Sequence, residues 1–271
     1  MSADQAGFEA LTREISRTAG LSLDSYKDKC LRRRIAVRMR ACGVQTYAEY
    51  QHVLARSPAE YEQLKDALTI NVTRFFRNAE TWERLAADYL PTLVAKVPGV
   101  IRVWSAGCSS GEEAYGLAIL LADAAIAAGD SRGLERVQVE ATDVDRRSLE
   151  RAANALYSAE ALAETPREVV ARYFEFQPDG WRVAEAVRRR VRVRRHDLGR
   201  DPPPGSYHLI VCRNVVIYFE RPTQERLFDA FVDALVPDGL LVLGKVETLF
   251  GPARERLQLV DPRERIYRRP A

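Results

Sequence analysis

The stretch Val100–Tyr115, VIRVWSAGCSSGEEAY, decides the fold class. The β-branched and aromatic residues at 100–104 predict a buried strand, and the apolar residues beyond Gly111 recur with the spacing of a helix. A loop of small residues lies between them, in which Gly107 and Gly111 let the backbone turn tightly against a ligand. A strand that leads through such a loop directly into a helix indicates a nucleoside-cofactor site in an α/β sheet.

The chemistry of this loop argues against a phosphate-binding cradle. It lacks the Lys-Ser/Thr ending of a P-loop, and it fits G-x-G-x-x-G only loosely. Glu112 and Glu113 in the first helical turn would repel a pyrophosphate, so a cofactor with positive charge, such as S-adenosylmethionine, fits better. Ser110 and Glu113 also match a capping box, which would explain both residues without a ligand. From this loop alone the two interpretations are about equally supported.

Composition sets the class of protein. A chain of 271 residues is long enough for one large α/β domain and a smaller module, and a net charge of +3 gives no general affinity for nucleic acid. Four cysteines and three histidines show no disulfide framework and no metal-ligand spacing, so we predict no metal and a reducing, cytoplasmic location. We also expect neither a signal peptide nor a membrane-spanning segment.

Two regions of different character follow one another. Residues 1–70 are expected to form a basic helical domain, with a helix from Asp24 to about Ala41 and further helices started by capping signals at Thr46 and Ser57. Residues 71–81 are expected to link it to a second domain, 82–271. Strands and helices alternate from Val100 onward, which predicts a doubly wound, mostly parallel Rossmann-like sheet.

Two segments depart from that alternation. Residues 173–195 have the period-two pattern of strands around a Pro-Asp-Gly turn, which predicts a small antiparallel β-subdomain inserted in the second domain. Residues 257–268 predict a terminal hairpin at the edge of the sheet.

Polar residues follow two of the predicted strands. Asp143 and Asp145 come directly after the second strand, where open α/β sheets bind ligands, and we assign Asp143 to the ribose of a cofactor and Asp145 to capping the next helix. Asn214 ends a later strand and is expected in the same crevice. Tyr218, one helical turn further on, either lines that crevice or is an ordinary core tyrosine with its hydroxyl at the surface.

The segment 71–77, NVTRFFR, lies at the junction of the two domains. It is either a hinge or a segment laid over the cofactor. In the second case Arg77 would clamp a carboxylate through two parallel hydrogen bonds.

Residues 27–40 form a strongly basic helix, with seven Lys or Arg against one acid, Asp28. Its apolar stripe, for packing, consists of Leu31, Ile35 and Met39. Charge of this density predicts an acidic partner, which by charge alone is nucleic acid, an anionic membrane surface or an acidic protein helix.

Taken together, these segments resemble the chemotaxis receptor glutamate methyltransferases, the CheR family, over nearly the whole chain. The matching features, in order, are the basic N-terminal helices, N-x-T-x-F-F-R at 71–77, AGCSSGEEAY at 106–115, Asp143 and Asp145, and CRNVVIYF at 212–219. The resemblance implies a Rossmann-like methyltransferase sheet that binds S-adenosylmethionine and releases S-adenosylhomocysteine. It also implies methylation of glutamate side chains on receptor coiled coils, giving γ-methyl esters.

The resemblance also implies particular site residues. Together with Gly107 from the tight turn, the expected cofactor contacts are Asn71, Thr73, Arg77, Glu113, Asp143, Asp197, Leu198 and Asn214. Arg77 and Tyr218 would flank the transferring methyl group. The residues expected to bind the receptor are Arg33, Arg34, Arg38 and Arg40.

The chain departs from the family pattern at three places. Asp197 stands where the family often has asparagine, and Gly244-Lys245-Val246-Glu247 replaces a GHSE-like sequence. The turn near 177–181 lacks the Gly-x-Gly loop of members that dock a receptor's C-terminal pentapeptide, so we expect no tethering of that kind.

Methyl transfer from a sulfonium to a carboxylate neutralises both charges, which favours a dry site. A glutamate is already ionised at neutral pH, so no strong base is needed and Arg77 serves to orient it.

Two alternatives remain. A nucleic-acid methyltransferase would carry Asn/Asp-Pro-Pro-aromatic after the strand that ends in Cys212, whereas Asp201-Pro202-Pro203-Pro204 precedes that strand. A non-catalytic cofactor-binding scaffold is disfavoured by the presence of Arg77 and Tyr218. We therefore expect a monomer whose partners are chemoreceptor helices, with no nucleic acid and no membrane insertion.

Overall fold

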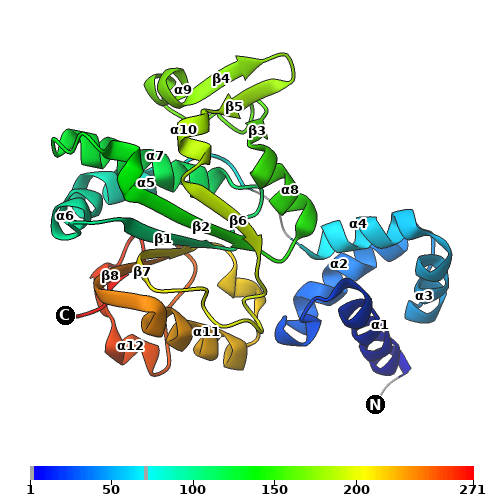
Figure 1. Ribbon diagram of the computed structural model, residues 1–271. Helices are drawn as coiled ribbons and strands as arrows, with labels where there is room; N and C mark the ends of the chain where they lie inside the picture. The colour runs from blue at the N-terminus through cyan, green and yellow to red at the C-terminus, as the bar shows by residue number, and fades with distance from the viewer. Residues whose placement is uncertain (1–2, 70–72) are drawn as a thin grey trace. The chain divides into compact units, whose positions relative to one another are not determined.

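The computed structural model describes residues 3–69 and 73–271 (Figure 1). The chain divides into two compact units. Among the described residues, the first unit comprises 3–69 with Tyr218–Gln224, and the second comprises 73–217 with Glu225–Ala271. Each unit has its own hydrophobic core, and each is described separately below.

The first unit is helical, as predicted. Its elements are α1 (Ala3–Ala19), the short 3-10 helix η1 (Leu23–Ser25), α2 (Asp28–Ala41), α3 (Tyr47–Arg56) and α4 (Pro58–Leu68). Helix α2 packs against α4, and α1 packs against α3. The fully buried residues of this small core include Leu11, Ile15, Ile35, Tyr50 and Leu64.

Local capping signals set two of these helices as expected. Thr46 accepts a hydrogen bond from the Glu49 amide and forms a full capping box, and Ser57 caps α4 ahead of Pro58. The predicted helix start at Asp24 is wrong, because α2 begins at Asp28. Residues 25–27 instead bond to the segment 218–220 of the same unit, with the Lys27 amide donating to the carbonyl of Tyr218 at 2.8 Å.

The second unit contains a seven-stranded sheet in the order β6-β2-β1-β7-β8-β10-β9. Its strands are β1 (Ile101–Ala106), β2 (Val137–Asp143), β6 (Val191–Arg195), β7 (Tyr207–Cys212), β8 (Leu235–Leu243), β9 (Gln258–Asp261) and β10 (Ile266–Arg268). The first five strands in that order run parallel, and β10 pairs antiparallel with both β8 and β9. The doubly wound sheet and the terminal hairpin at its edge are both confirmed.

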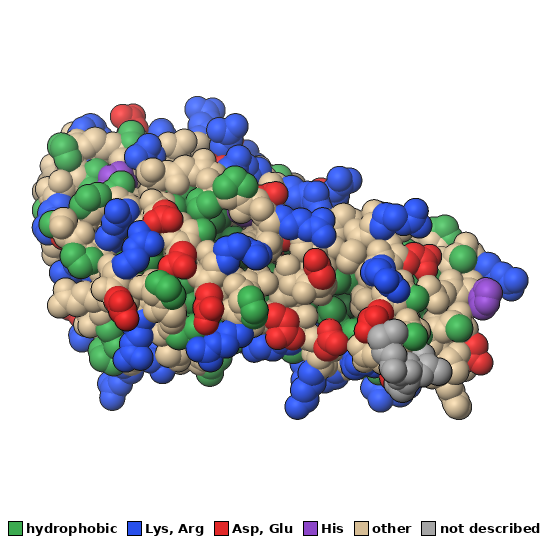
Figure 2. Space-filling view, turned by 90° about the horizontal axis from the view of Figure 1, so that it is seen from below, with side chains coloured by type: hydrophobic (Ala, Val, Ile, Leu, Met, Phe, Trp, Pro, Cys, Tyr) green, Lys and Arg blue, Asp and Glu red, His purple; other side chains and the backbone are tan. Residues whose placement is uncertain are grey.

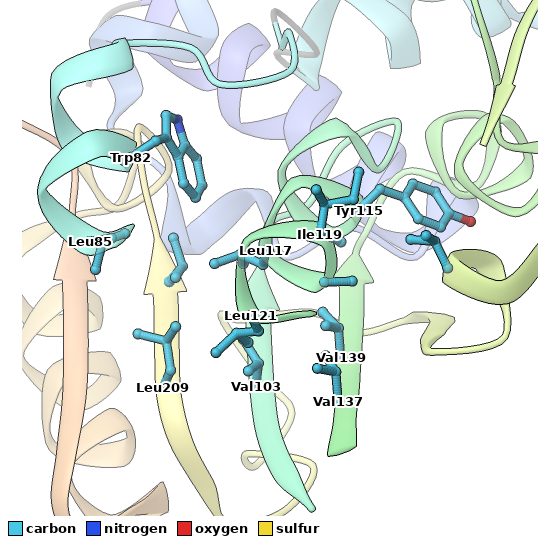
Figure 3. Packing of buried hydrophobic residues seen from close by; sticks show 14 of the residues in the cluster. Trp82, Leu85, Val103, Tyr115, Leu117, Ile119, Leu121, Val137, Val139 and Leu209 are labelled. Carbon is cyan, nitrogen blue, oxygen red and sulfur yellow. The ribbon is translucent and has the colours of Figure 1, made fainter. Parts of the chain in front are cut away.

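Helices cover the sheet, and the core lies between the layers. They are α5 (Ala79–Arg84), the π-helix η2 (Leu85–Tyr89), α6 (Leu90–Lys96), α7 (Glu112–Ala127), η3 (Gly133–Arg136), α8 (Arg146–Asn154), η4 (Val216–Tyr218), α11 (Arg221–Ala234) and α12 (Ala253–Arg256). Figure 3 shows Leu117 and Leu121 of α7 lying over strand residues such as Val103. On the opposite face, Phe231 of α11 meets Trp104 of β1 edge-on, with ring centroids 5.4 Å apart.

The inserted subdomain begins and ends earlier in the chain than predicted. It contains β3 (Leu156–Tyr157), α9 (Arg167–Tyr173), β4 (Phe174–Gln177), β5 (Gly180–Val183) and α10 (Glu185–Arg188), with the sheet order β3-β5-β4. Residues 191–195 are predicted to belong to this subdomain, but they form β6 and pair parallel with β2 in the main sheet. Arg192 is exposed whereas Val191 and Val193 are half-buried. An edge strand covered on one face alternates in the same way as an antiparallel strand, so the pattern could not separate the two.

Candidate cofactor and active site

The carboxyl ends of β1, β2, β6 and β7 meet at one edge of the sheet. Ala106 pairs with Thr142 at the end of β1 and β2, and Asp143 pairs with Arg195 at the end of β2 and β6. Since neighbouring parallel strands end at the same edge, the loops that follow them converge there, as ligand sites of open α/β sheets do.

The loop after β1 requires glycine at its first position. Gly107 has a φ of +83°, and the amides of Gly107 and Cys108 both donate to the carbonyl of Thr142, at 2.8 and 2.9 Å. A Cβ added at Gly107 would lie 2.6 Å from Cγ2 of Val215. The backbone of the loop after β1 is therefore in direct contact with Val215 of the loop after β7.

The capping-box explanation of Ser110 and Glu113 is wrong. The N-cap of α7 is Gly111, which has a φ of +96° and no side-chain cap. Ser110 Oγ donates to the carboxylate of Glu112 at 2.9 Å, and Glu113 Oε1 accepts from Ser105 Oγ of β1, also at 2.9 Å. Glu113 is thus directed toward the end of β1 and not back over the start of its own helix.

The side chain of Asp143 links the loop after β1 to the end of β2. One carboxylate oxygen accepts from the amide of Ser109 at 2.8 Å, and the other accepts from the amide of Asp145 at 2.9 Å. Asp145 caps α8 as predicted, because its side chain accepts from the amides of Arg147 and Ser148. Asp143 is therefore held by two backbone amides at the end of β2, and its contact with a ribose stays a prediction.

Asp197 and Leu198 reach the same edge because β6 belongs to the main sheet. The amide of His196 donates to the carbonyl of Asp143 at 2.9 Å, which brings the loop after β6 beside Asp143. Asp197 is buried, and its Oδ1 accepts from the amide of Gly199 at 2.9 Å. Leu198 is partly exposed.

The segment before α5 also reaches this edge. The hydroxyl of Thr73 hydrogen bonds to Glu112, and the positive charge of Arg77 acts on Glu113. The carbonyl of Arg77 accepts from the indole of Trp82 at 2.9 Å. Asn71, which the resemblance placed at the cofactor, lies outside the described residues.

Arg213 is a buried cation at this edge that is not among the predicted site residues. Its Nη1 lies 3.9 Å from Glu113 Oε2, its Nη2 donates to the carbonyl of Arg77 at 3.1 Å, and its guanidinium lies over the ring of Trp82. Its Nε has no hydrogen-bond partner among the described residues. Its position in the sequence could have indicated a role in the site, because Arg213 is a charged residue directly after a predicted buried strand and directly before Asn214.

Asn214 adopts a left-handed conformation, with a φ of +60°, directly after β7. Its amide donates to Oε2 of Glu247 at 3.0 Å. Gly107, Glu113, Asp143, Asp197, Leu198 and Asn214 therefore all lie in the second unit at or just after the carboxyl ends of its strands. Thr73 and Arg77 precede α5 in the same unit and interact there with Glu112 and Glu113.

The site has an excess of buried carboxyl groups. Burial raises the pKa of Glu112, Glu113 and Asp143, whereas Arg77 and Arg213 are the basic side chains whose charges act on Glu113. Desolvation of acids is relieved by a nearby positive charge. This arrangement fits a ligand with sulfonium and ammonium groups, as S-adenosylmethionine has.

The arginines predicted to bind a receptor have different environments within the first unit. Arg34 is buried, donates to the carbonyl of Leu68, and has its guanidinium 4.9 Å from the ring centre of Tyr218. Arg38 forms an ion pair with Glu60. These two side chains serve internal packing, which corrects the expectation that all four face a partner.

Arg33 and Arg40 are exposed on α2, as are Lys29 and Val37. Spacings of three and four residues put these side chains on one face of the helix. Figure 2 shows basic and acidic side chains interspersed over the face that it presents.

Within the described ranges, none of the helices is long and apolar enough to cross a membrane. The same residues contain no group of His, Cys, Asp and Glu arranged to hold a metal ion.

Comparison with known proteins agrees with a cofactor-binding methyltransferase. Residues 71–266 match the family model described as "CheR methyltransferase, SAM binding domain", and residues 6–69 match "CheR methyltransferase, all-alpha domain". The chain belongs to the CheR methyltransferase family.

Several curated relatives are similar over most of their length. The chemotaxis protein methyltransferase of Listeria innocua is 34% identical over 89% of this chain and 90% of the relative. The chemotaxis protein methyltransferase of Klebsiella aerogenes is 34% identical over 92% of this chain and 86% of the relative. Chemotaxis protein methyltransferase 2 of Pseudomonas aeruginosa is 34% identical over 89% of this chain and 85% of the relative.

Proposed function

We propose that this S-adenosylmethionine-dependent methyltransferase forms γ-methyl esters on glutamate side chains of chemoreceptor cytoplasmic helices. The observation that carries the proposal is the set of buried carboxyl groups around the loop after β1, with Arg77 beside them. The names of the relatives support chemotaxis proteins as the substrate class.

The residues of the chain have distinct parts in this reaction. The cofactor, when bound, supplies an electrophilic methyl group on a positively charged sulfur. Asp143 and Asn214 hold the cofactor from the ends of β2 and β7, and Glu113 balances its positive charge. Arg77 orients the substrate carboxylate, which is already ionised at neutral pH and needs no base. The role of Tyr218, to lie beside the transferring methyl group, is proposed from the resemblance to the family alone.

The exposed face of α2 is the proposed receptor-binding surface. Lys29, Arg33 and Arg40 give it positive charge, and Val37 adds an apolar contact that is 48% exposed. Methylatable glutamates lie among other acids on receptor helices, so opposite charges favour encounter. The β4–β5 connection consists of Pro178 and Asp179 alone, and we propose that receptors bind without a C-terminal pentapeptide tether.

A radiolabelled methyl-transfer assay tests this function. The protein is incubated with methyl-labelled S-adenosylmethionine and a purified receptor cytoplasmic fragment, and base-labile methanol is counted. We expect transfer that is lost when the receptor glutamates are replaced by alanine. Arg77→Ala should lower kcat at least about tenfold, whereas Arg74→Ala, whose exposed side chain pairs with Glu164, should resemble the parent protein.

Two results would contradict the proposal. Transfer of label to RNA and not to receptor would support a nucleic-acid methyltransferase. Tight cofactor binding without transfer to any receptor fragment would support a scaffold without turnover.

A further inference from the structure

Glu247 is a buried carboxylate that binds four backbone amides. Its side chain lies on the loop after β8, and the residue is 3% exposed. Oε2 accepts from the amides of Gly244 at 2.6 Å and Asn214 at 3.0 Å. Oε1 accepts from the amides of Val215 at 2.9 Å and Ile217 at 3.2 Å.

Three of these four amides follow β7: those of Asn214 and Val215 lie in the loop, and that of Ile217 lies in the first turn of η4. A chain turning with a φ of +60° at Asn214 cannot satisfy these amides within a regular helix or strand, so the carboxylate takes the place of backbone partners. A carboxylate has enough lone pairs to accept from all four amides. A glutamine side chain would have an NH2 group in place of one oxygen, and this group would face two of the backbone N–H donors without being able to accept from them.

Gly244 makes room for this arrangement. A Cβ at position 244 would lie 2.8 Å from Oε2 of Glu247, 2.9 Å from the Asn214 amide nitrogen and 3.1 Å from Asn214 Nδ2. The Gly244 and Glu247 positions are therefore a matched pair, and both act on Asn214.

The loop after β7, which Glu247 holds in place, also contacts the loop after β1. The amide of Val215 is bound to Glu247, while its side chain lies against Gly107, where an added Cβ would be 2.6 Å from Cγ2. One carboxylate thus sets the position of Asn214 and of the residue that supports the turn after β1.

We propose that Glu247 is a positioning residue of the cofactor site, which determines affinity for S-adenosylmethionine by fixing residues 214–217 without contacting the cofactor itself. The proposal rests on the proposed function only in taking Asn214 and the loop after β1 as cofactor contacts. It assigns a role to two residues of the Gly244-Lys245-Val246-Glu247 sequence, where the chain departs from the family pattern.

The test compares Glu247→Gln and Gly244→Ala with Val246→Ala as a matched control. Val246 lies in the same loop but is 72% exposed. Affinity for S-adenosylhomocysteine is measured by calorimetry. Amide hydrogen exchange of the ligand-free protein and its melting temperature are measured alongside. Gly244→Ala disturbs the same contacts while keeping the carboxylate, so the test does not depend on one variant folding.

We expect both variants to weaken S-adenosylhomocysteine binding at least about tenfold, the effect of losing roughly one hydrogen bond to a charged group. Amide exchange in 214–217 should accelerate while exchange in β1 and β2 stays protected. In turnover, KM for S-adenosylmethionine should rise while KM for the receptor fragment is unchanged. Val246→Ala should bind as the parent protein does.

Unchanged affinity in both variants would overturn the positioning role, and so would faster exchange throughout the sheet with a matching fall in melting temperature, which indicates a purely structural residue. These outcomes leave the proposed function intact. A parent protein that does not bind S-adenosylhomocysteine would instead contradict the proposed function.

Discussion

The guanidinium of Arg38 in α2 donates to both carboxylate oxygens of Glu60 in α4, with 3.0 Å between Nε and Oε1. Glu60 is 9% exposed and also accepts from the hydroxyl of Tyr50 at 2.7 Å. The hydrogen bonds from Arg38 hold the pKa of Glu60 below its usual range. Part of the charge of the basic helix therefore holds the helical unit together and is not offered to a partner.

This ion pair predicts a pH-dependent stability. Glu60→Gln should lower the free energy of unfolding of the helical unit by about 2 kcal/mol at pH 7, because Arg38 loses a charged partner. Since the pKa of Glu60 is depressed in the folded state, its contribution is present above the unfolded pKa of about 4.3 and is lost as pH falls through the lower folded value.

Denaturant unfolding between pH 2 and pH 7 measures this difference. Glu62→Gln is the control, because Glu62 pairs with Lys65 on the surface, where both side chains are at least 33% exposed. A difference between Glu60→Gln and the parent that stays constant down to pH 2 would contradict the assignment.

The two exposed arginines of α2 should act on receptor binding and not on stability. Reversing both, Arg33→Glu with Arg40→Glu, should raise KM for a receptor fragment roughly tenfold, since each exposed ion pair contributes up to about 1 kcal/mol. Affinity for S-adenosylhomocysteine should stay the same. Salt should have a similar effect on the parent protein, because exposed charges more than about 8 Å apart are screened at physiological ionic strength.

Arg13→Glu with Arg17→Glu, two exposed changes on α1, is the control for net charge. Steady-state kinetics at several receptor concentrations give KM and kcat separately. If the reversed variant keeps the KM of the parent, receptor binding through this face of α2 is disproved. Reversal of Arg34 or Arg38 is expected to unfold the helical unit and would not report on binding.

Cofactor binding should release protons and weaken at acid pH. Burial raises the pKa of Glu112, Glu113 and Asp143, and a bound cation favours their ionised forms. Affinity for S-adenosylmethionine should therefore be highest above these raised pKa values and fall as the pH decreases through them.

Calorimetry in two buffers with different ionisation enthalpies counts the protons released. S-adenosylhomocysteine, which lacks the sulfonium charge, should release fewer protons than S-adenosylmethionine. Equal proton release by the two ligands, with affinity that does not change between pH 5 and pH 8, would show that the buried acids do not respond to the cofactor's charge.

Gly107 should tolerate no side chain. Gly107→Ala places a Cβ 2.6 Å from Val215 Cγ2 and strains a backbone with a φ of +83°. We expect loss of measurable S-adenosylhomocysteine binding. Gly129→Ala supplies the control, because Gly129 has a φ of +78° and nothing within 4 Å of the added Cβ. Gly129→Ala should lower the free energy of unfolding by only about 1 kcal/mol, the strain of an alanine in the left-handed conformation.

Melting temperature and ligand affinity are compared for the two alanine variants. Equal effects of Gly107→Ala and Gly129→Ala on both measurements would mean that contact between the β1 and β7 loops does not matter.

Much of the fold was predictable because its signals are local. The capping box at Thr46, the cap at Asp145 and the strand that begins near Ile101 depend on residues within a few positions of one another. The predictions were wrong where contacts between residues far apart in the sequence determine the structure. Residues 191–195 have the alternation of a hairpin strand, and only pairing with β2 places them in the main sheet.

The sequence by itself determined the strand and helix order, and hence that Gly107, Asp143 and Asn214 follow strands whose carboxyl ends share one edge. Only the tertiary structure decided which charged side chains are used in internal contacts and which remain available to a ligand or a partner. It places Arg38 against Glu60 and Glu247 against Asn214, pairs that are 22 and 33 positions apart. A hydrogen bond between residues so distant leaves no periodic or compositional signal, because its geometry exists only when the elements have packed.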